Sequence, residues 1–223
     1  MRGKATPRTT VRRVPGRGAH DPESIDALID EALICHLGFT EDSVPYVIPT
    51  IHARLGDTIY FHGSPASRAL RRSGGAEVCL TVTLLDGLVL ARSAFHHSMN
   101  YRSVMVLGRA REVTDAEEKL CALRAIVNHV CPGRWDEARR PNLKEFTKTL
   151  VVALPLEEAS LKTRSGPPVD EDQDLARDVW AGVLPLEMVA RPPVPDDLMM
   201  TDTHVPDYLH WTRPAERLSD LAD

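Results

Sequence analysis

Hydrophobic and polar residues repeat with two different periods in the first half of the chain. A helical period follows Asp21 and Pro22, which are suited to the N-cap and the first helical position. Short apolar runs separated by turn residues come next and predict strands. The apolar face of the helix is predicted to comprise Ile25, Leu28, Ile29 and Ala32. The predicted strands span residues 33–39, 44–53, 58–62, 77–85, 88–93 and 101–113.

Proline and glycine positions refine these strands. Pro45 and Pro49 predict an edge, a bulge or irregular pairing in the second strand, because proline cannot donate to a ladder. Asp86-Gly87 predicts a tight hairpin turn between residues 77–85 and 88–93. Gly108 predicts a bulge or a barrel corner inside the long strand.

The second half of the chain predicts one more helix and further strands. Thr114 to Glu117 reads as a capping box, and Pro132-Gly133 ends the helix that follows it. Short strands outnumber helices and are joined by tight turns, so the pattern predicts a mainly β protein, an antiparallel barrel with helices packed outside. The helix is predicted to bury Leu120, Leu123, Val127 and Val130, and the strands to span residues 150–154, 159–162 and 180–190.

Composition divides the chain into three parts. Residues 1–20 hold six basic residues and no acid, which predicts a flexible basic arm. Residues 21–190 form the predicted domain, and residues 191–223 a Pro- and Asp-rich tail. The net charge of −5 argues against nucleic-acid binding, and the absence of an apolar run of ~20 residues argues against a membrane span. We therefore expect a cytoplasmic protein.

Common catalytic and nucleotide-binding motifs are absent from the sequence. It contains no G-x-G-x-x-G, Walker, G-x-S-x-G, H-E-x-x-H or C-x-x-C pattern. His96-His97 is a conspicuous pair, but adjacent residues on a strand point to opposite sides, so we expect no metal there. The pair is interpreted as polar loop residues near a site.

The segment at residues 61–75 predicts an anion site. With Ser64 as N-cap and Pro65 at the first helical position, the N–H groups of Ala66, Ser67 and Arg68 are free at a helix N-terminus. The Ser67 hydroxyl and the guanidinium groups of Arg68, Arg71 and Arg72 add donors and charge, which suits a phosphate. The alternative is a capped surface helix with solvated arginines. Upstream, residues 46–50 form either an extended backbone suited to a planar ring or an ordinary strand.

The order of several short motifs resembles the pyridoxamine 5′-phosphate oxidase-like, FMN-binding split-barrel family. The resemblance covers residues 21–190 and is strongest to the flavin-nucleotide-binding branch that includes nitroimidazole-resistance proteins. It implies an antiparallel split β-barrel and a homodimer with FMN at the subunit interface. The motifs are, in order, CHLGF, PYVIPT, YFHGSPASRALRR, HHSMNYRSVMVLGRAREV and VWAGVLPL.

The resemblance also implies roles for particular residues. Backbone groups of the second strand would line the isoalloxazine ring, the next strand end and helix start would hold the phosphate and ribityl chain, and two later segments would approach the flavin. Arg71 is added on charge alone. The implied residues are Val47, Ile48, Pro49, Thr50, His62, Gly63, Ser64, Ser67, Arg68, Asn100, Tyr101, Arg102, Ser103, Trp180 and Gly182.

The sequence departs from the family pattern where the vitamin substrate would bind. Residues 183–190 contain neither Arg nor His, which argues against pyridoxamine phosphate as substrate. At the phosphate, Ala69 replaces a basic residue that family members often have just after the phosphate-binding Ser-Arg pair. We expect an FMN-dependent oxidoreductase acting on another small molecule. The alternative is a carrier or sensor without turnover that binds flavin, F420 or haem, with His62 or His97 as haem ligand. His62 is the candidate catalytic residue, as a proton donor or a hydrogen bond to substrate, with a structural role as the alternative.

Overall fold

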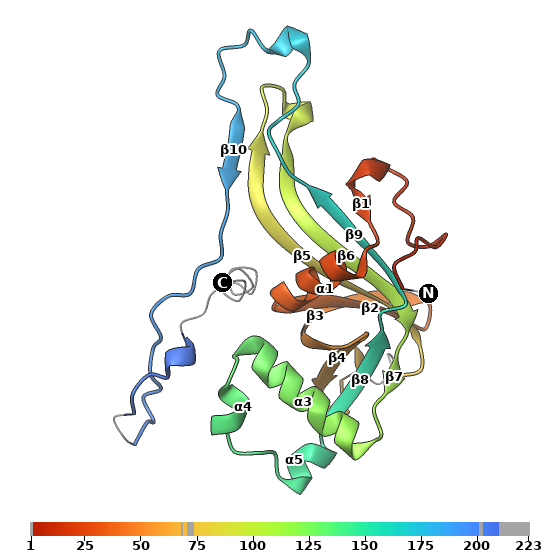
Figure 1. Ribbon diagram of the computed structural model, residues 1–223, viewed down its shortest axis with the longest axis vertical. Coiled ribbons are helices and arrows are strands. Elements are labelled where there is room, and N and C mark those ends of the chain that lie inside the picture. The colour runs from red at the N-terminus through yellow and green to blue at the C-terminus, as the bar shows by residue number, and fades with distance from the viewer. Residues whose placement is uncertain (1, 68, 71–73, 201–202, 210–223) are drawn as a thin grey trace.

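The computed structural model describes residues 2–67, 69–70, 74–200 and 203–209. These residues form a ten-stranded, antiparallel sheet with helices beside it (Figure 1). The helices are α1 (Pro22–Glu31), α3 (Ala116–Val130), α4 (Arg134–Glu137) and α5 (Leu143–Thr147). The strands are β1 (Gly18–Ala19), β2 (Ile34–Glu41), β3 (Val44–Leu55), β4 (Thr58–Gly63), β5 (Glu77–Leu90), β6 (Ser98–Arg109), β7 (Arg111–Glu112), β8 (Leu150–Pro155), β9 (Glu158–Arg164) and β10 (Gly182–Pro185).

The sheet curls into an open barrel. The strand order is β1-β9-β6-β5-β2-β3-β4-β8-β7, and β10 pairs with β5 outside this path. β6 pairs with β9, and the chain then turns at Ala110 into β7, which pairs with β8. The two ends of the sheet are thereby brought together by one stretch of chain. This mainly β, split-barrel architecture with helices outside confirms the predicted fold class.

β3 explains the two prolines that were predicted to mark an edge. Residues 44–51 pair with β2, whereas β3 pairs with β4 only from His52 to Leu55. Within the described residues, the first two thirds of β3 therefore have one unpaired edge. Pro45 and Pro49 lie in this part, where one missing N–H donor is tolerated.

The predicted hairpin at Asp86-Gly87 is wrong. β5 runs unbroken from Glu77 to Leu90, and the register with β6 shifts between Leu85 and Gly87. Gly87 is buried between β6 and β10, and a Cβ added to it would lie 3.1 Å from the Leu184 carbonyl oxygen. A bulge or a barrel corner was expected at Gly108. The shift in strand register is instead at Gly87, and the sheet turns its corner at Ala110.

Helix predictions succeed at α1 and are shifted at α3. Asp21 caps α1 by accepting from the Ser24 N–H at 2.8 Å, as predicted. In α3 the cap is Asp115, which accepts from the Glu118 N–H at 2.7 Å, so the predicted box at Thr114 is one residue early. The face of α3 shifts accordingly: Leu120 and Val130 are exposed, while Ala122, Leu123 and Ile126 are buried. The short helices α4 and α5 were not predicted.

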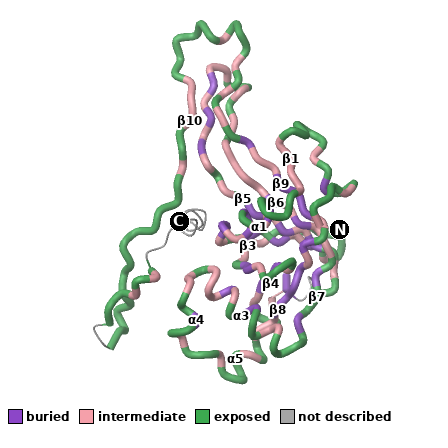
Figure 2. Tube along the Cα trace, viewed as in Figure 1, coloured by how far each residue is buried: buried purple, intermediate pink, exposed green. Residues whose placement is uncertain are grey.

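Two apolar clusters hold the fold together. One fills the barrel beneath α1 and includes Ile29, Phe61 and Leu80. The other lies between β4, β8 and α3 and includes Tyr60 and Ile126. Buried residues concentrate in these regions, and the segment after β10 is exposed (Figure 2).

Of the predicted last strand at residues 180–190, only Gly182–Pro185 is strand. No described helix has the length and apolar character of a membrane span.

The basic arm packs against the sheet. Arg8 donates to Glu158 at 2.8 Å and to Glu77 at 3.0 Å, and Arg2 pairs with Asp26 and Asp57. β1 pairs with β9, which places the end of the arm at the sheet edge. A composition typical of a mobile segment therefore accompanies specific long-range contacts.

A buried imidazole joins α1, β3 and α3. His52 has no exposed surface, its Nε2 is 2.9 Å from the Ile29 carbonyl, and its ring centroid is 4.9 Å from that of His129. Burial, reinforced by repulsion from His129, lowers the pKa of His52 to about 4. The folded state therefore holds a neutral imidazole at a pH where an unfolded chain binds a proton.

This burial predicts a loss of stability in mild acid. Because the folded-state pKa lies below the unfolded value, the stabilisation is complete above the unfolded pKa and is lost as the pH falls toward 4. We expect the unfolding free energy from urea titrations to fall by about 2 kcal/mol between about pH 7 and pH 5 through His52. His52→Gln should remove this contribution, and His204→Gln, in the exposed tail, should retain it. An unchanged pH slope in His52→Gln would refute the assignment.

Candidate functional site

β4 places its last side chains in two different environments. Ile59 and Phe61 point into the barrel cluster, whereas Tyr60 belongs to the cluster under α3. The Tyr60 hydroxyl donates to Glu118 at 2.8 Å, which ties β4 to the first turn of α3. His62 follows on the side of Tyr60 and pairs in register with Val151 of β8. The strand period therefore directs His62 toward the helices.

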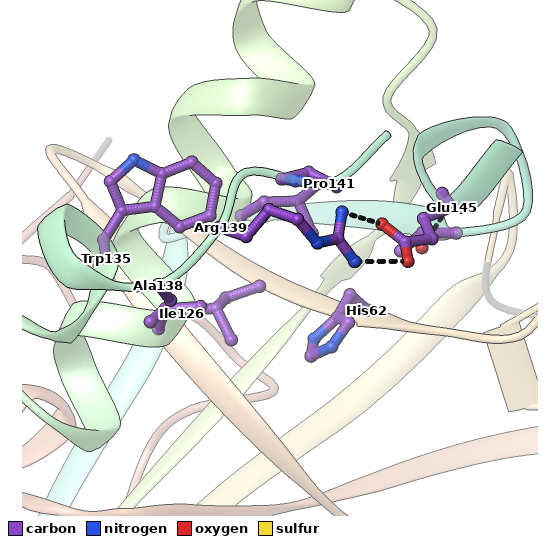
Figure 3. Close-up of a pocket in the computed structure, with 10 residues that line it drawn as sticks. His62, Ile126, Trp135, Ala138, Arg139, Pro141 and Glu145 are labelled. Atoms are coloured by element: carbon purple, nitrogen blue, oxygen red, sulfur yellow. Dashed lines mark hydrogen bonds and ion pairs between the residues drawn. The ribbon is translucent and has the colours of Figure 1, made fainter. Parts of the chain in front are cut away.

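The His62 side chain faces a cavity between β4 and the segment from α3 to α5 (Figure 3). The cavity has a volume of about 280 Å³. His62 Nδ1 is buried and has no hydrogen-bond partner in the described part of the chain. Burial lowers the pKa of His62, so the imidazole is neutral near pH 7. The cavity wall is mostly apolar, formed by Leu123, Ile126, Val127, Trp135, Ala138 and Pro141.

One ion pair crosses the polar side of this cavity. Arg139 donates to Glu145 through both terminal nitrogens, at 3.0 and 2.8 Å (Figure 3). The Arg139 guanidinium lowers the pKa of Glu145 to about 2. Trp135 is 8% exposed, and the Arg140 guanidinium lies over its ring, 4.6 Å from the ring centroid. The cavity thus combines a neutral imidazole, an aromatic wall and a fixed guanidinium.

Apart from His62, the sequence interpretation identified no member of this cavity as a site residue, and it placed Leu123 and Val127 only on the buried face of a helix. Trp135, Arg139 and Glu145 lie on two short helices and the turn between them. A signal was present: Asn142 caps α5 and Glu145 returns a bond to the Asn142 N–H at 2.8 Å, a complete capping box. It predicts a helix start but says nothing of the packing against β4.

The predicted helix start at Pro65 is a turn. The Ser64 carbonyl accepts from the Ser67 N–H at 2.8 Å, and the Ser64 hydroxyl accepts from the Ala66 N–H at 3.1 Å. Ala69 and Leu70 are helical, so the helix begins after Ser67. Proline is as suited to the second position of a turn as to a first helical position, and here the turn prevails. Two of the N–H groups expected at the phosphate are bonded within this turn.

The predicted phosphate residues are described only in part. Arg68, Arg71 and Arg72 lie outside the described residues. Gly63 and Ser64 directly follow His62, so they lie at the rim of the β4 end. Gly63 also has a packing role, because a Cβ there would lie 2.6 Å from Leu70 Cδ1.

The residues predicted to line a ring lie along the unpaired edge of β3. Val47 is 67% exposed, Pro49 is exposed, and Ile48 and Thr50 are half-buried. Within the described chain, β2 is the only strand that pairs with this stretch of β3. The backbone donors and acceptors along its other edge therefore pair with no strand. This geometry suits the predicted contact between backbone and a planar ring.

The four residues predicted on β6 divide between its two faces. Arg102 points inward, where it donates to Glu31 at 2.9 Å and to Asp86 at 2.9 and 3.1 Å, and these carboxylates raise its pKa. Asn100 accepts from Arg164. Tyr101 and Ser103 instead line a cavity on the outer face, together with the basic arm. Arg102 is therefore committed to a structural ion-pair network.

Trp180 and Gly182 lie far from His62 within one chain. They precede and begin β10, which pairs with the end of β5, whereas β4, which carries His62 one residue before its end, lies lower in the view near α3 (Figure 1). Trp180 is 67% exposed, and its ring covers Gly182, where a Cβ would lie 2.9 Å from the indole.

His96 and His97 face one cavity on the outer side of the sheet. They belong to a single 3-10 turn, not to a strand, so the expected opposition of their side chains does not hold. His97 Nδ1 is 3.0 Å from the Ser93 carbonyl, and His96 Nε2 is 3.7 Å from Glu171. The described residues contain no group of three or more His, Cys, Asp or Glu side chains suited to a metal ion.

The chain is similar to several known proteins in sequence and in fold. The family model described as pyridoxamine 5′-phosphate oxidase matches residues 21–163. The flavocytochrome Anf3 from Azotobacter vinelandii is 40% identical, with 92% of this chain and 97% of that chain covered and a TM-score of 0.87. The FAD and heme binding protein from Mycobacterium smegmatis is 34% identical, with 86% and 95% covered and a TM-score of 0.82.

A third solved structure is more distant. The putative 5-nitroimidazole antibiotic resistance protein from Bacteroides thetaiotaomicron is 27% identical, with 65% of this chain and 85% of that chain covered and a TM-score of 0.54. No curated protein matches the chain.

Gly63 provides a test of how tightly the end of β4 is packed. Gly63→Ala should lower the unfolding free energy by about 1–3 kcal/mol, because the added methyl group overlaps Leu70. Gly74→Ala is the matched control, since its nearest neighbour would be 3.6 Å away, an ordinary contact. Urea unfolding of both variants measures the difference. Equal stability of the two variants would show that β4 and Leu70 are not in close contact.

Proposed function

Because the chain belongs to the pyridoxamine 5′-phosphate oxidase family, we propose that it is a flavin-binding redox protein that also binds haem through His62. Two similar solved structures support the pairing of cofactors, since one is named a flavocytochrome and the other a FAD and heme binding protein. The flavin expected from the sequence is FMN, while the second of these names specifies FAD. The proposal is therefore a bound flavin, and chromatography of the released cofactor would distinguish the two forms.

The His62 cavity carries the haem part of the proposal. Haem iron in proteins is commonly held by a histidine, and the ligand must be a neutral imidazole. His62 meets this requirement because burial lowers its pKa and its ring faces the cavity (Figure 3).

The lining of the cavity has a chemistry that suits a planar, mostly apolar group with charged edges. Trp135, Ile126 and Val127 provide an apolar wall that excludes water. Arg139, at the polar side, is suited to a propionate, and Glu145 holds the guanidinium in place. A bound haem would supply one-electron transfer. Residues of this chain would bind the iron, orient the macrocycle and keep water away.

The unpaired edge of β3 supports the flavin part of the proposal. Val47 and Pro49 are exposed there, and the backbone beside them is unpaired on one side within the described sheet. Ser64 and Ser67 would approach the phosphate from the turn after β4. The bound flavin would supply hydride or electron transfer, while the chain would fix the ring through backbone hydrogen bonds.

A homodimer would complete the flavin site. Ile34 and Ile51 pair across β2 and β3 and are 53% and 39% exposed, and the exposed Pro49 and Val47 follow on the same face of β3. Contiguous exposed apolar residues on a sheet favour an interface. Trp180 and Gly182 are remote from His62 in the same chain, so they would reach a flavin bound across this interface. We propose an oxidoreductase whose small-molecule substrate is not pyridoxamine phosphate, since residues 183–190 lack Arg and His.

The visible spectrum of purified protein tests the haem ligand. We expect a Soret band in the wild-type protein and its loss in His62→Gln, because glutamine cannot replace an imidazole as ligand. His97→Gln is the matched control, since His97 lies on the outer face, and it should keep the band. A Soret band that survives in His62→Gln but is lost in His97→Gln would assign the haem to the other cavity. A wild-type protein that shows no Soret band after incubation with haemin and removal of the unbound haemin would refute haem binding.

Dimerisation and flavin binding should fail together. Ile51→Asp should convert the protein to a monomer in sedimentation velocity and reduce its bound flavin, because the substitution places a charge in the apolar contact. Leu120→Asp, 45% exposed on α3, should leave both unchanged. Acid release of the cofactor followed by chromatography would distinguish FMN from FAD. An Ile51→Asp variant that remains a dimer with full flavin content would contradict this interface.

A further inference from the structure

The C-terminal segment projects a small turn into solvent. Residues 187–200 are exposed throughout, and in the view of Figure 1 they lie on the left, whereas the N-terminal arm lies on the right. Within the segment, the Asp196 carbonyl accepts from the Met199 N–H at 3.1 Å, and the Asp196 carboxylate accepts from the Leu198 N–H at 3.0 Å. These two bonds close the turn. Residues 194–200 are named the tail turn below.

Both ends of this segment are fixed to the body of the protein. Before it, residues 182–185 pair with β5. After it, the Tyr208 hydroxyl donates to Glu137 and accepts from Arg134 at 3.3 Å. The Tyr208 ring lies against Gly133, where an added Cβ would be 3.4 Å from it. The tail turn is therefore held on the α4 side of its chain, apart from the arm of the same chain (Figure 1).

The tail turn combines two carboxylates with apolar side chains. Neither Asp196 nor Asp197 forms an ion pair with another described residue. Val194, Leu198 and Met200 are 91%, 82% and 97% exposed. A closed turn that presents neighbouring apolar side chains to solvent favours contact with another molecule. The surface that complements it would carry positive charge beside apolar side chains.

Such a surface lies on the other side of the chain, between the N-terminal arm and the outer face of β6 and β9. It consists of two cavities, of about 450 and 390 Å³, that share Arg13, Tyr101 and Lys162 in their walls. The larger cavity adds Arg17 and Arg164 to these cations. The two cavities together are named the arm groove. The apolar lining of the larger cavity consists of Val14, Phe95 and Val169.

Strand register places the cations of the arm groove beside one another. Lys162 of β9 pairs with Gly18 of β1 on one side and with Ser103 of β6 on the other. Arg164 follows two residues later, on the same face of β9. The pairing of Gly18 also positions Arg17, which directly precedes it. The arm is therefore a structural wall of the groove.

The cations of the larger cavity have no carboxylate partners. An acid close to the cavity is already paired, because Asp170 binds the Arg92 guanidinium at 3.0 Å and accepts the Arg92 N–H at 2.9 Å. The arm groove therefore concentrates positive charge without compensation. Within the described ranges, no ion pair involves Arg13, Arg17, Lys162 or Arg164.

Arg164 has an open edge that suits a carboxylate. It is 7% exposed, and its Nη1 donates to Asn100 and to the Gly166 carbonyl at 2.9 Å, while its Nη2 donates to the Pro167 carbonyl at 3.0 Å. These acceptors are neutral, and they leave the Nε–H and one Nη2–H of the guanidinium for another acceptor. Burial and repulsion from Arg17 lower the pKa of Arg164. A carboxylate at this edge would compensate a costly buried charge.

We propose that the tail turn of one copy of this chain occupies the arm groove of a second copy, and that the second copy returns the same contact. The two carboxylates would lie against Arg17, Lys162 and Arg164. Leu198 and Met200 would cover the apolar lining. A reciprocal exchange of this kind closes a twofold pair. The contact requires a second copy but neither flavin nor haem.

Zero-length crosslinking of the wild-type protein tests this contact directly. A carbodiimide joins a carboxylate to an amine where the two touch. Mixing isotope-labelled with unlabelled protein, under conditions that allow subunit exchange, identifies links between copies. We expect a crosslink between Asp196 or Asp197 of one copy and Lys162 of the other, in peptides of mixed label. The absence of this crosslink, or its presence only within single copies, would overturn the proposal.

Charge exchange between the two surfaces provides a second test. Asp197→Lys and Lys162→Glu each bring like charges together, so each should weaken self-association by roughly 10- to 100-fold in sedimentation equilibrium, the range for bonds to charged groups. An equimolar mixture of the two variants should regain most of the wild-type affinity, because each of its two contacts again joins opposite charges. Glu117→Lys and Arg124→Glu, both exposed on α3, are matched controls that should stay within about twofold of wild type.

The outcomes separate this contact from the proposed function. Single variants that associate like the wild type, or a mixture that does not recover, would overturn the proposal. Unchanged association of Asp197→Lys, together with binding of inorganic phosphate that Lys162→Glu abolishes, would also overturn it and assign the groove to a small anion. A protein that shows the crosslink but binds neither flavin nor haem would refute the proposed function and leave this inference standing.

Discussion

Antiparallel pairing of β4 with β8 is the constraint on which the His62 site depends. β4 is covered on both faces, by the barrel cluster on one side and by α3 on the other. Because side chains alternate along a strand, Phe61 enters the barrel and His62 enters the cavity. A slip of one residue would place the imidazole in the barrel core and a phenyl ring in the cavity. The site and the core are therefore specified by one register.

The sheet separates two electrostatic environments. On the helix side, a neutral imidazole lies in a mostly apolar cavity where burial opposes charge. On the arm side, a second cavity is larger than the His62 cavity. It is lined by four cations that have no carboxylate partners among the described residues. The first environment suits a group that accepts the lone pair of the imidazole, and the second suits an anion. Arg102 lies between them, and its bonds to Glu31 and Asp86 join β6 to α1 and β5.

The sequence was sufficient for the elements whose signals are local. Asp21-Pro22 predicts α1, the two prolines predict the open edge of β3, and the motif order predicts the split barrel. Local signals failed where non-local pairing decided the outcome. Asp86-Gly87 is a strong turn signal, yet β6 and β10 hold it in a continuous strand.

The candidate site was predictable only in part for the same reason. His62 was identified because it ends a strand, but Trp135 and Arg139 reach it through packing of short helices that the sequence does not reveal. At Ser64 and Pro65, one pattern fits both a helix cap and a turn, so local sequence alone does not distinguish the two. The basic arm was expected to be flexible from its composition. Its partners, Glu77 and Glu158, are distant in sequence and therefore gave no local signal.

The proposed role of His62 as an iron ligand in an apolar cavity is open to a direct test. An anomalous difference map from crystals of the haem-loaded protein, recorded at the iron absorption edge, would locate the metal. We expect a single peak per chain in the cavity lined by His62 and Trp135. A peak beside His97 on the arm side, or haem-loaded crystals with no peak near His62, would contradict this role.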